Sequence, residues 1–130
     1  MNKPNLLTAP SATQTPMDPA NVPTVLTVAG SDSSGGAGIQ ADLKSIQANG
    51  AFGCSAIVAL TAQNTKGVQG VHAAPLAFVE AQLESVLSDI DVDVVKTGML
   101  PSADVIGAVA ARVDRDAGLA LVVDPVMVAR

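Results

Sequence analysis

The sequence lacks tryptophan and tyrosine altogether, and its 130 residues include two phenylalanines, one cysteine and one histidine. A single cysteine excludes an internal disulfide, and without a Cys/His cluster we assign no metal-ligating residues. The net charge of −5 and the aromatic content of 2% leave neither a basic patch nor a stacking platform, which excludes nucleic acid as a partner. No apolar run approaches the ~20 residues that cross a bilayer, so we expect no membrane partner and a cytoplasmic protein.

The lone cysteine and the lone histidine are not expected to be catalytic. Cys54 stands beside Gly53 and ahead of a predicted strand, where a small buried hydrophobic residue fits better than a nucleophile. His72 lies at a connection between elements and outside any polar cluster. We therefore look for functional residues in other loops of the chain.

Apolar residues are abundant, at 48% of the chain with a mean hydropathy of +0.40. In a single domain of this length, such a composition predicts strands that are covered on both faces. Residues 1–23 differ, because they are rich in Pro, Thr, Ala and Asn and show no periodicity. We expect this segment to be a disordered tail, and it contains no apolar stretch like that of a signal peptide.

The most informative stretch is a strand, a turn and a helix in succession. Val25–Ala29 is an apolar run that predicts a buried strand, Ser31–Gly38 is a Gly/Ser/Asp turn, and a helix follows that Asn49-Gly50 closes. The unpaired N–H groups at such a helix start face the mouth of the loop. The turn matches neither GxxxxGK[ST] nor GxGxxG, so the residues alone leave open a ligand loop or a structural turn.

The rest of the chain alternates between predicted strands and helices. The expected elements are a strand over Ser55–Thr61, a polar loop over Ala62–Gly67, an extended piece over Val68–His72, a helix that Pro75 opens, a strand over Asp93–Thr97, a helix that Pro101-Ser102 opens and a strand over Leu119–Val123. The residues predicted on the inner faces of the two helices are Leu76, Val79, Leu83, Val86 and Leu87, and then Val105, Ile106, Val109 and Val113. This alternation predicts parallel strands joined by right-handed crossovers, with helices on both faces of the sheet.

Four loops follow the carboxyl ends of the predicted strands, and in a parallel sheet these ends share one edge. They are Gly30–Gly38, Gln63–Thr65, Gly98–Met99 and Asp124–Met127. Ligands of open α/β sheets bind at this edge. Gln63 and Asn64 are therefore candidates for ligand contacts, although polar residues that only cap and solvate a loop give the same pattern.

Four segments carry a resemblance to a known family. GSDSSGGAGIQADLK, ALTAQNTKGVQGV, VVKTGML and VVDPVM follow one another in the order found in the amino-terminal half of hydroxymethylpyrimidine/phosphomethylpyrimidine kinases of thiamine biosynthesis. The resemblance implies a ribokinase-like, three-layer α/β/α fold with a mostly parallel sheet, truncated here. Residues 24–130 would form the amino-terminal part of the kinase domain.

The resemblance also implies an activity and a binding site. Members of the family phosphorylate 4-amino-5-hydroxymethyl-2-methylpyrimidine and then its monophosphate, with ATP and Mg²⁺. Gly30, Asp42, Gln63 and Met99 match positions that line the pyrimidine pocket of the family. A carboxylate and a carboxamide suit the edge of an aminopyrimidine, and a methionine suits its face. Asp124 matches an acidic position near the phosphates and the metal, which makes it a candidate cofactor-binding residue.

The family's catalytic base and anion hole belong to its carboxyl-terminal half, so we identify no catalytic residue here. We expect the 130-residue chain alone to be inactive and poorly soluble, with Leu119–Val123 as an exposed edge strand. A full-length form could be a homo-oligomer. Two alternatives stay open, a pyridoxal/pyridoxine kinase of the same fold and a fragment that binds the pyrimidine without turning it over.

Overall fold

A computed structural model describes residues 21–116 and 118–126 of the chain. The elements are β1 (Thr24–Gly30), α1 (Gly38–Ala48), β2 (Phe52–Asn64), β3 (Gly67–Ala73), α2 (Leu76–Leu87), β4 (Val94–Thr97), α3 (Ala103–Arg115) and β5 (Ala120–Val123). Most of the predicted tail, residues 1–20, lies outside the described residues. Within the described ranges, no helix combines the length and the apolar character needed to cross a membrane.

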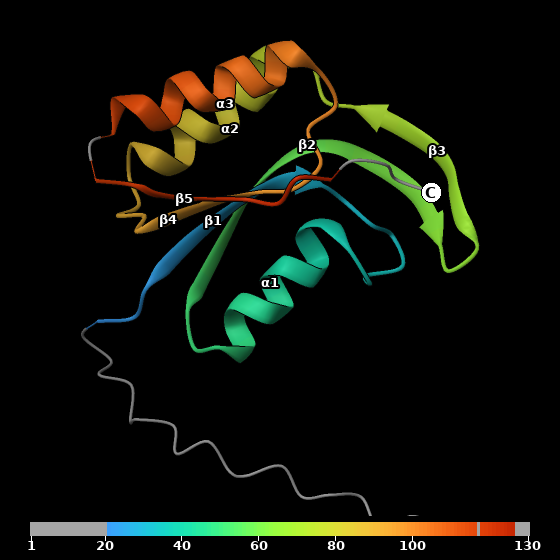
Figure 1. Ribbon diagram of the computed structural model, residues 1–130, viewed down its shortest axis with the longest axis horizontal. Coiled ribbons are helices and arrows are strands. Elements are labelled where there is room, and N and C mark those ends of the chain that lie inside the picture. The colour runs from blue at the N-terminus through green and yellow to red at the C-terminus, as the bar shows by residue number, and fades with distance from the viewer. Residues whose placement is uncertain (1–20, 117, 127–130) are drawn as a thin grey trace, which may run out of the picture.

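The strands form one sheet in the order β3-β2-β1-β4-β5 (Figure 1). β1 lies at its centre and pairs in parallel with β2 on one side and β4 on the other, and β5 continues the parallel part beyond β4. Only β3 runs antiparallel, alongside the end of β2. The predicted, mostly parallel α/β sheet is therefore confirmed.

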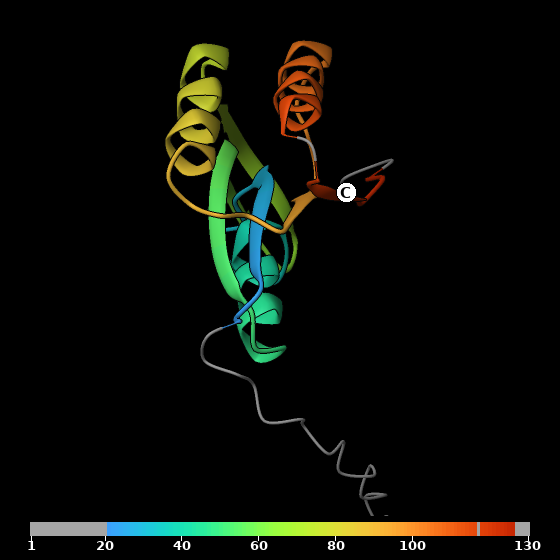
Figure 2. The same cartoon turned by 90° about the vertical axis from the view of Figure 1, so that its left-hand side faces the viewer.

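The helices cover both faces of this sheet, as predicted, which makes three layers. Figure 2 shows α2 and α3 together on one side and α1 on the other. Successive residues of β1 point to opposite faces, so Leu26 and Val28 join the core beneath α2 and α3, while Thr27 points toward α1. All three side chains are fully buried, which accounts for the predominance of apolar and β-branched residues in this strand.

β2 is longer than the sequence predicted. Residues 62–64, expected in a polar loop, continue the strand because they pair with β3, with Gln63 opposite Val68 and Asn64 opposite Gly67. The turn at the tip of this hairpin shrinks to Thr65 and Lys66. The interpretation of the whole segment as a loop is wrong, since the antiparallel partner supplies hydrogen bonds that allow polar residues to remain extended.

The inner faces of α2 and α3 were predicted nearly correctly. Val79 and Leu83 of α2 and Val105 and Val109 of α3 are buried, at i and i+4 on each helix. Leu76 is an error, because its side chain is 38% exposed at the start of α2, and so is Ile106, whose side chain is 52% exposed. Ile106 follows Val105 by one residue, a rotation of about 100° that turns it away from the sheet.

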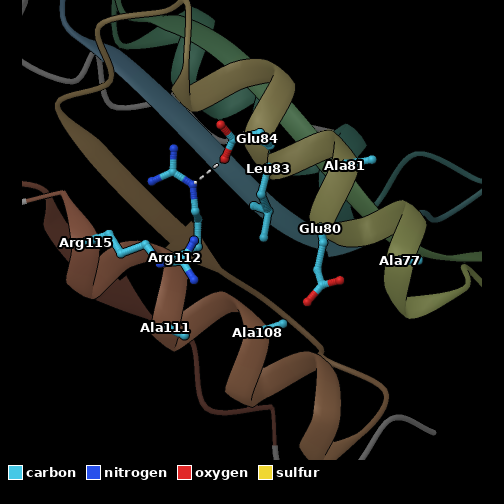
Figure 3. A pocket seen from close by; sticks show the side chains of 9 residues that line it. All are labelled: Ala77, Glu80, Ala81, Leu83, Glu84, Ala108, Ala111, Arg112 and Arg115. Atoms are coloured by element: carbon cyan, nitrogen blue, oxygen red, sulfur yellow. Dashed lines mark hydrogen bonds and ion pairs between the residues drawn. The ribbon is translucent and has the colours of Figure 1, made fainter.

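A groove of about 350 Å³ separates α2 from α3 on the outer side of the sheet (Figure 3). Small residues line it from both helices, namely Ala77 and Ala81 on α2 and Ala108 and Ala111 on α3. At one end the Arg112 Nε donates to the Glu84 Oε2 at 3.2 Å and links the two helices. The short alanine side chains leave space between the two helices, and the Arg112–Glu84 ion pair links the helices at one end of it.

β5 is the outer strand of the described sheet, as expected for this length of chain. Its apolar side chains are largely exposed, at 48% for Leu121, 53% for Val122 and 61% for Val123. Within residues 21–116 and 118–126, no strand pairs with its outer edge, and apolar side chains flank that edge, which is the arrangement that promotes association with another strand.

Candidate functional site

The Gly-rich loop after β1 binds its own carboxylate. Asp32, only 3% exposed, accepts hydrogen bonds from the backbone N–H of Ser34, Gly36 and Ala37 and from the Ser34 hydroxyl, at 2.7–3.0 Å. The Ser34 hydroxyl foremost, and then these N–H groups, hold the pKa of the Asp32 carboxyl below its ordinary value of 3.8 against the opposing effect of burial. The amide groups of the loop just before α1 are therefore occupied by a carboxylate of the loop itself.

The loop reaches α1 by a close approach of two backbone segments. Gly38 has φ 57°, and a Cβ atom there would lie 2.3 Å from the carbonyl oxygen of Gly30. Only glycine tolerates both conditions, so Gly38 is required for the turn itself. Lys44, nearly two turns farther along α1, donates to the carbonyl oxygen of Gly35 at 2.8 Å and holds the outer side of the loop.

Hydroxyl groups join the loop to the end of β2. The Ser33 Oγ donates to the carbonyl oxygen of Gln63 and accepts from its N–H, both at 2.8 Å. The Thr61 Oγ1 donates to the carbonyl oxygen of Ser31 at 2.8 Å, and the Ser31 N–H donates to Ala59 at the same distance. These bonds fix the backbone of Gln63 against the Gly-rich loop.

Beside this junction lies a cavity of about 470 Å³, within the range of small-ligand sites. Four of the five predicted binding residues line it, namely Gly30, Gln63, Met99 and Asp124. A Cβ atom at Gly30 would stand 3.1 Å from the Met99 Cε, so the glycine leaves room for that methyl group. The loops that the sequence placed at one edge of the sheet do meet around one space.

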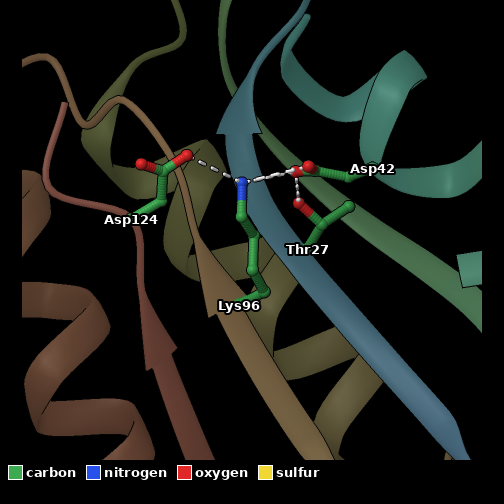
Figure 4. A network of polar contacts seen from close by, with 4 residues as sticks. All are labelled: Thr27, Asp42, Lys96 and Asp124. Carbon is green, nitrogen blue, oxygen red and sulfur yellow. Dashed lines mark hydrogen bonds and ion pairs between the residues drawn. The ribbon is translucent and has the colours of Figure 1, made fainter. Parts of the chain in front are cut away.

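Asp42, the fifth predicted residue, does not line this cavity. Its carboxylate accepts from the Thr27 hydroxyl at 2.6 Å and from the Lys96 ammonium, whose Nζ lies 3.0 Å from both carboxylate oxygens (Figure 4). The same Nζ lies 3.4 Å from the Oδ2 of Asp124. Lys96 does line the cavity and so stands between Asp42 and the space.

The sequence analysis did not single out Lys96 or Asp32. Lys96 occupies β4 between Val95 and Thr97, both buried, and a lysine in such a strand is the signal that could have drawn attention to it. Asp32 was visible only as one polar residue of a polar turn. Nothing in its spacing indicates that four donors converge on its carboxylate.

A model of the family "Phosphomethylpyrimidine kinase" matches residues 32–130. The chain belongs to this family. The hydroxymethylpyrimidine/phosphomethylpyrimidine kinase of Escherichia coli is 55% identical over 105 residues, which are 81% of this chain and 40% of the relative. The curated relatives are longer proteins, of which the chain spans between 14% and 41%.

Solved structures agree with this assignment to the phosphomethylpyrimidine kinase family. That of the phosphomethylpyrimidine kinase from Clostridium difficile superposes with a TM-score of 0.78 at 48% identity, over 81% of this chain and 48% of that one. The pyridoxal kinase of Staphylococcus aureus, solved in complex with pyridoxal, gives a TM-score of 0.76 at 39% identity, over 83% of this chain and 41% of that one. These matches confirm the ribokinase-like fold.

Neither Cys54 nor His72 lines the cavity. Cys54 is half-buried and packs against the core, and burial raises the pKa of its thiol above the ordinary value of 9.0. A thiol of this kind is mostly protonated at neutral pH and is a poor nucleophile. His72 is exposed on β3, opposite Leu60.

Asp124 is the carboxylate at this site that suits a divalent cation. Among the described residues, no three His, Cys, Asp or Glu side chains converge as a metal-binding group. Asp124 is 53% exposed and faces the cavity, so its carboxylate is accessible. Mg²⁺ is commonly held by one or two carboxylates together with substrate phosphates, and Asp124 fits that limited part.

Proposed function

We propose that this chain forms the pyrimidine-binding part of a kinase that phosphorylates 4-amino-5-hydroxymethyl-2-methylpyrimidine and then its monophosphate in thiamine biosynthesis. The observation that carries the proposal is the cavity at the carboxyl edge of the sheet. In a member of the phosphomethylpyrimidine kinase family, it brings together Gly30, Gln63 and Met99, which are 69 residues apart at most.

The chemistry of the lining suits a small aminopyrimidine. The carboxamide of Gln63 can donate to a ring nitrogen or accept from the exocyclic amine, and its backbone is already held by Ser33. Met99 offers a polarisable apolar surface for the face of the ring. Asp42 would act through Lys96, since its carboxylate is bound by that ammonium and by Thr27.

ATP would supply the phosphoryl group, and Mg²⁺ would neutralise charge that develops on it. Asp124 is the residue of this chain that we propose to hold the metal or the phosphates. The catalytic base and the anion hole are not assigned to any described residue, because the resemblance places them in the other half of the enzyme. We further propose a cytoplasmic protein whose partner is the small pyrimidine.

The test is a chimera in which residues 25–126 replace the matching segment of the Escherichia coli kinase. This background supplies the part of the longer relative that the chain does not span, without changing the residues of the cavity. We expect ATP-dependent phosphorylation of the hydroxymethylpyrimidine and of its monophosphate, followed by mass spectrometry. A folded chimera that phosphorylates neither compound would contradict the proposal.

The pyridoxal kinase alternative is favoured by one observation, the likeness to the Staphylococcus aureus enzyme. Assaying the chimera with pyridoxal separates the two functions, because the proposed function requires a higher kcat/KM for the pyrimidine. The non-catalytic alternative predicts a different outcome, in which the full 130-residue chain binds the pyrimidine while the chimera turns over neither compound.

A further inference from the structure

Lys96 holds an unusual position for a lysine, with its ammonium between two carboxylates at the wall of the cavity (Figure 4). The side chain is 21% exposed and belongs to a strand whose neighbouring residues, Val95 and Thr97, are buried. Its contact with Asp42 is short and involves both carboxylate oxygens, at 3.0 Å each. Asp42 is 17% exposed, so this is the better shielded of the two ion pairs.

The contact with Asp124 is weaker. The Lys96 Nζ lies 3.4 Å from the Asp124 Oδ2, and the Asp124 side chain is 53% exposed. An ammonium has three N–H donors, and Asp42 requires at most two of them. At least one donor is therefore directed toward Asp124 and the cavity, where a ligand oxygen could replace or share the long contact.

The charges around the cavity make this donor significant. Among the described residues that line it, Asp32 and Asp124 carry negative charge and Lys96 alone carries positive charge. A sphere of 470 Å³ is about 10 Å across, so any group bound inside stays within about one Debye length of the ammonium. An anionic ligand would meet two carboxylates there, and Lys96 is the lining residue that offsets them.

We propose that Lys96 is a specificity-determining residue that favours the phosphorylated pyrimidine over the unphosphorylated alcohol. This inference rests on the proposed function, in which both compounds use the same cavity. To first order the ammonium has no Coulomb interaction with the neutral alcohol, whereas it attracts a phosphate with almost two negative charges. Loss of the ammonium also leaves Asp42 and Asp124 without their counter-charge, which adds repulsion for the phosphate alone.

The experiment compares two dissociation constants. Isothermal titration calorimetry measures binding of the hydroxymethylpyrimidine and of its monophosphate to the chimera and to its Lys96→Met variant. We expect the substitution to weaken binding of the monophosphate by about tenfold or more relative to binding of the alcohol. Lys96→Arg keeps the charge and should keep most of the preference.

Lys66→Met is the matched control, because it removes the same charge from an exposed residue at the tip of the β2–β3 hairpin. It should change both dissociation constants by the same factor. If Lys96→Met does not fold, the Lys96→Met/Asp42→Asn double variant replaces it, because it leaves no unpaired carboxylate at Asp42. The kcat/KM values of the chimera for the two compounds, with and without these substitutions, give the same comparison.

The outcomes separate this inference from the function on which it rests. Equal losses for both compounds in the Lys96 variants, with wild-type binding intact, would overturn the specificity role alone. A wild-type chain and chimera that bind neither compound would overturn both proposals. Retention of the preference in Lys96→Met would show that another group recognises the phosphate.

Discussion

The hydroxyl of Ser33 and the backbone of Gln63 form a reciprocal pair, in which Ser33 donates to the Gln63 carbonyl and accepts from the Gln63 N–H, each at 2.8 Å. The two residues are 30 positions apart and belong to different segments, the Gly-rich loop and the end of β2. This pair makes the loop part of the wall against which Gln63 is held. The position of a proposed substrate contact thus depends on a residue that does not line the cavity.

Ser33→Ala is expected to loosen Gln63. It removes two hydrogen bonds in a solvent-accessible place, so the free energy of unfolding should fall by about 1 kcal/mol. Pyrimidine binding should weaken by a few-fold, as measured by titration calorimetry. Ser45→Ala, at an exposed position of α1, is the control and should alter neither quantity. Full-strength binding by Ser33→Ala would mean that Gln63 needs no support from the loop.

Gln63→Ala is expected to be the most damaging single change to pyrimidine recognition. Loss of a buried hydrogen-bonding partner costs about 1–3 kcal/mol, or ~5- to 150-fold in kcat/KM. The measurement is steady-state kinetics in the chimera with the hydroxymethylpyrimidine. Gln69→Ala is a matched control, since Gln69 lies on β3 and its amide bonds only within the hairpin. Unchanged kinetics for Gln63→Ala would remove it from the site.

Asp42→Asn should weaken pyrimidine binding and leave ATP binding nearly intact. The substitution removes the charge that holds the Lys96 ammonium, so the lysine can shift toward Asp124. The separate dissociation constants of the pyrimidine and of a non-hydrolysable ATP analogue, measured in the chimera, test this. Equal losses for both ligands would instead indicate a general folding defect, which a lowered melting temperature would reveal.

Asp32 should make the stability of the fold sensitive to acid. Its pKa in the folded state is lower than the ordinary value of 3.8, so its contribution is present above that value and is lost as the pH falls through the folded pKa. Urea unfolding of the chimera between neutral pH and strongly acidic pH measures the effect. Asp32→Asn should be less stable at neutral pH and should lose less stability below pH 3.8. Parallel pH curves for the two proteins would refute this role.

The 130-residue chain by itself should lack kinase activity and associate through β5. Its edge exposes Leu121, Val122 and Val123, and burial of such side chains is worth roughly 1.5–3 kcal/mol each. Size-exclusion chromatography with light scattering should find oligomers or aggregates. Val123→Lys should reduce this association, because a charge on an edge strand opposes strand pairing. A monomeric wild-type chain that phosphorylates the pyrimidine would show that both expectations are wrong.

The sequence by itself determined the features that depend on neighbouring residues. The apolar run of β1 and the i, i+4 spacing of Val79 and Leu83 identified a strand and a helix, because side-chain periodicity follows directly from local backbone geometry. Asn49 and Gly50 marked the end of α1 for a similar reason. Gly50 has φ 81°, which suits the residue after a helix, and its N–H donates to the carbonyl oxygen of Gln47.

Only the tertiary structure decided the features that join distant segments. The antiparallel pairing of β3 made a strand of residues expected in a loop, and the contacts of Lys96 span 54 residues to Asp42 and 28 to Asp124. Such contacts depend on sheet order and strand register, which place β4 beside β1 and bring its lysine beneath α1. Local periodicity predicts neither the order of the strands nor their register, because a side chain's partner across a sheet is set by the packing of the whole chain.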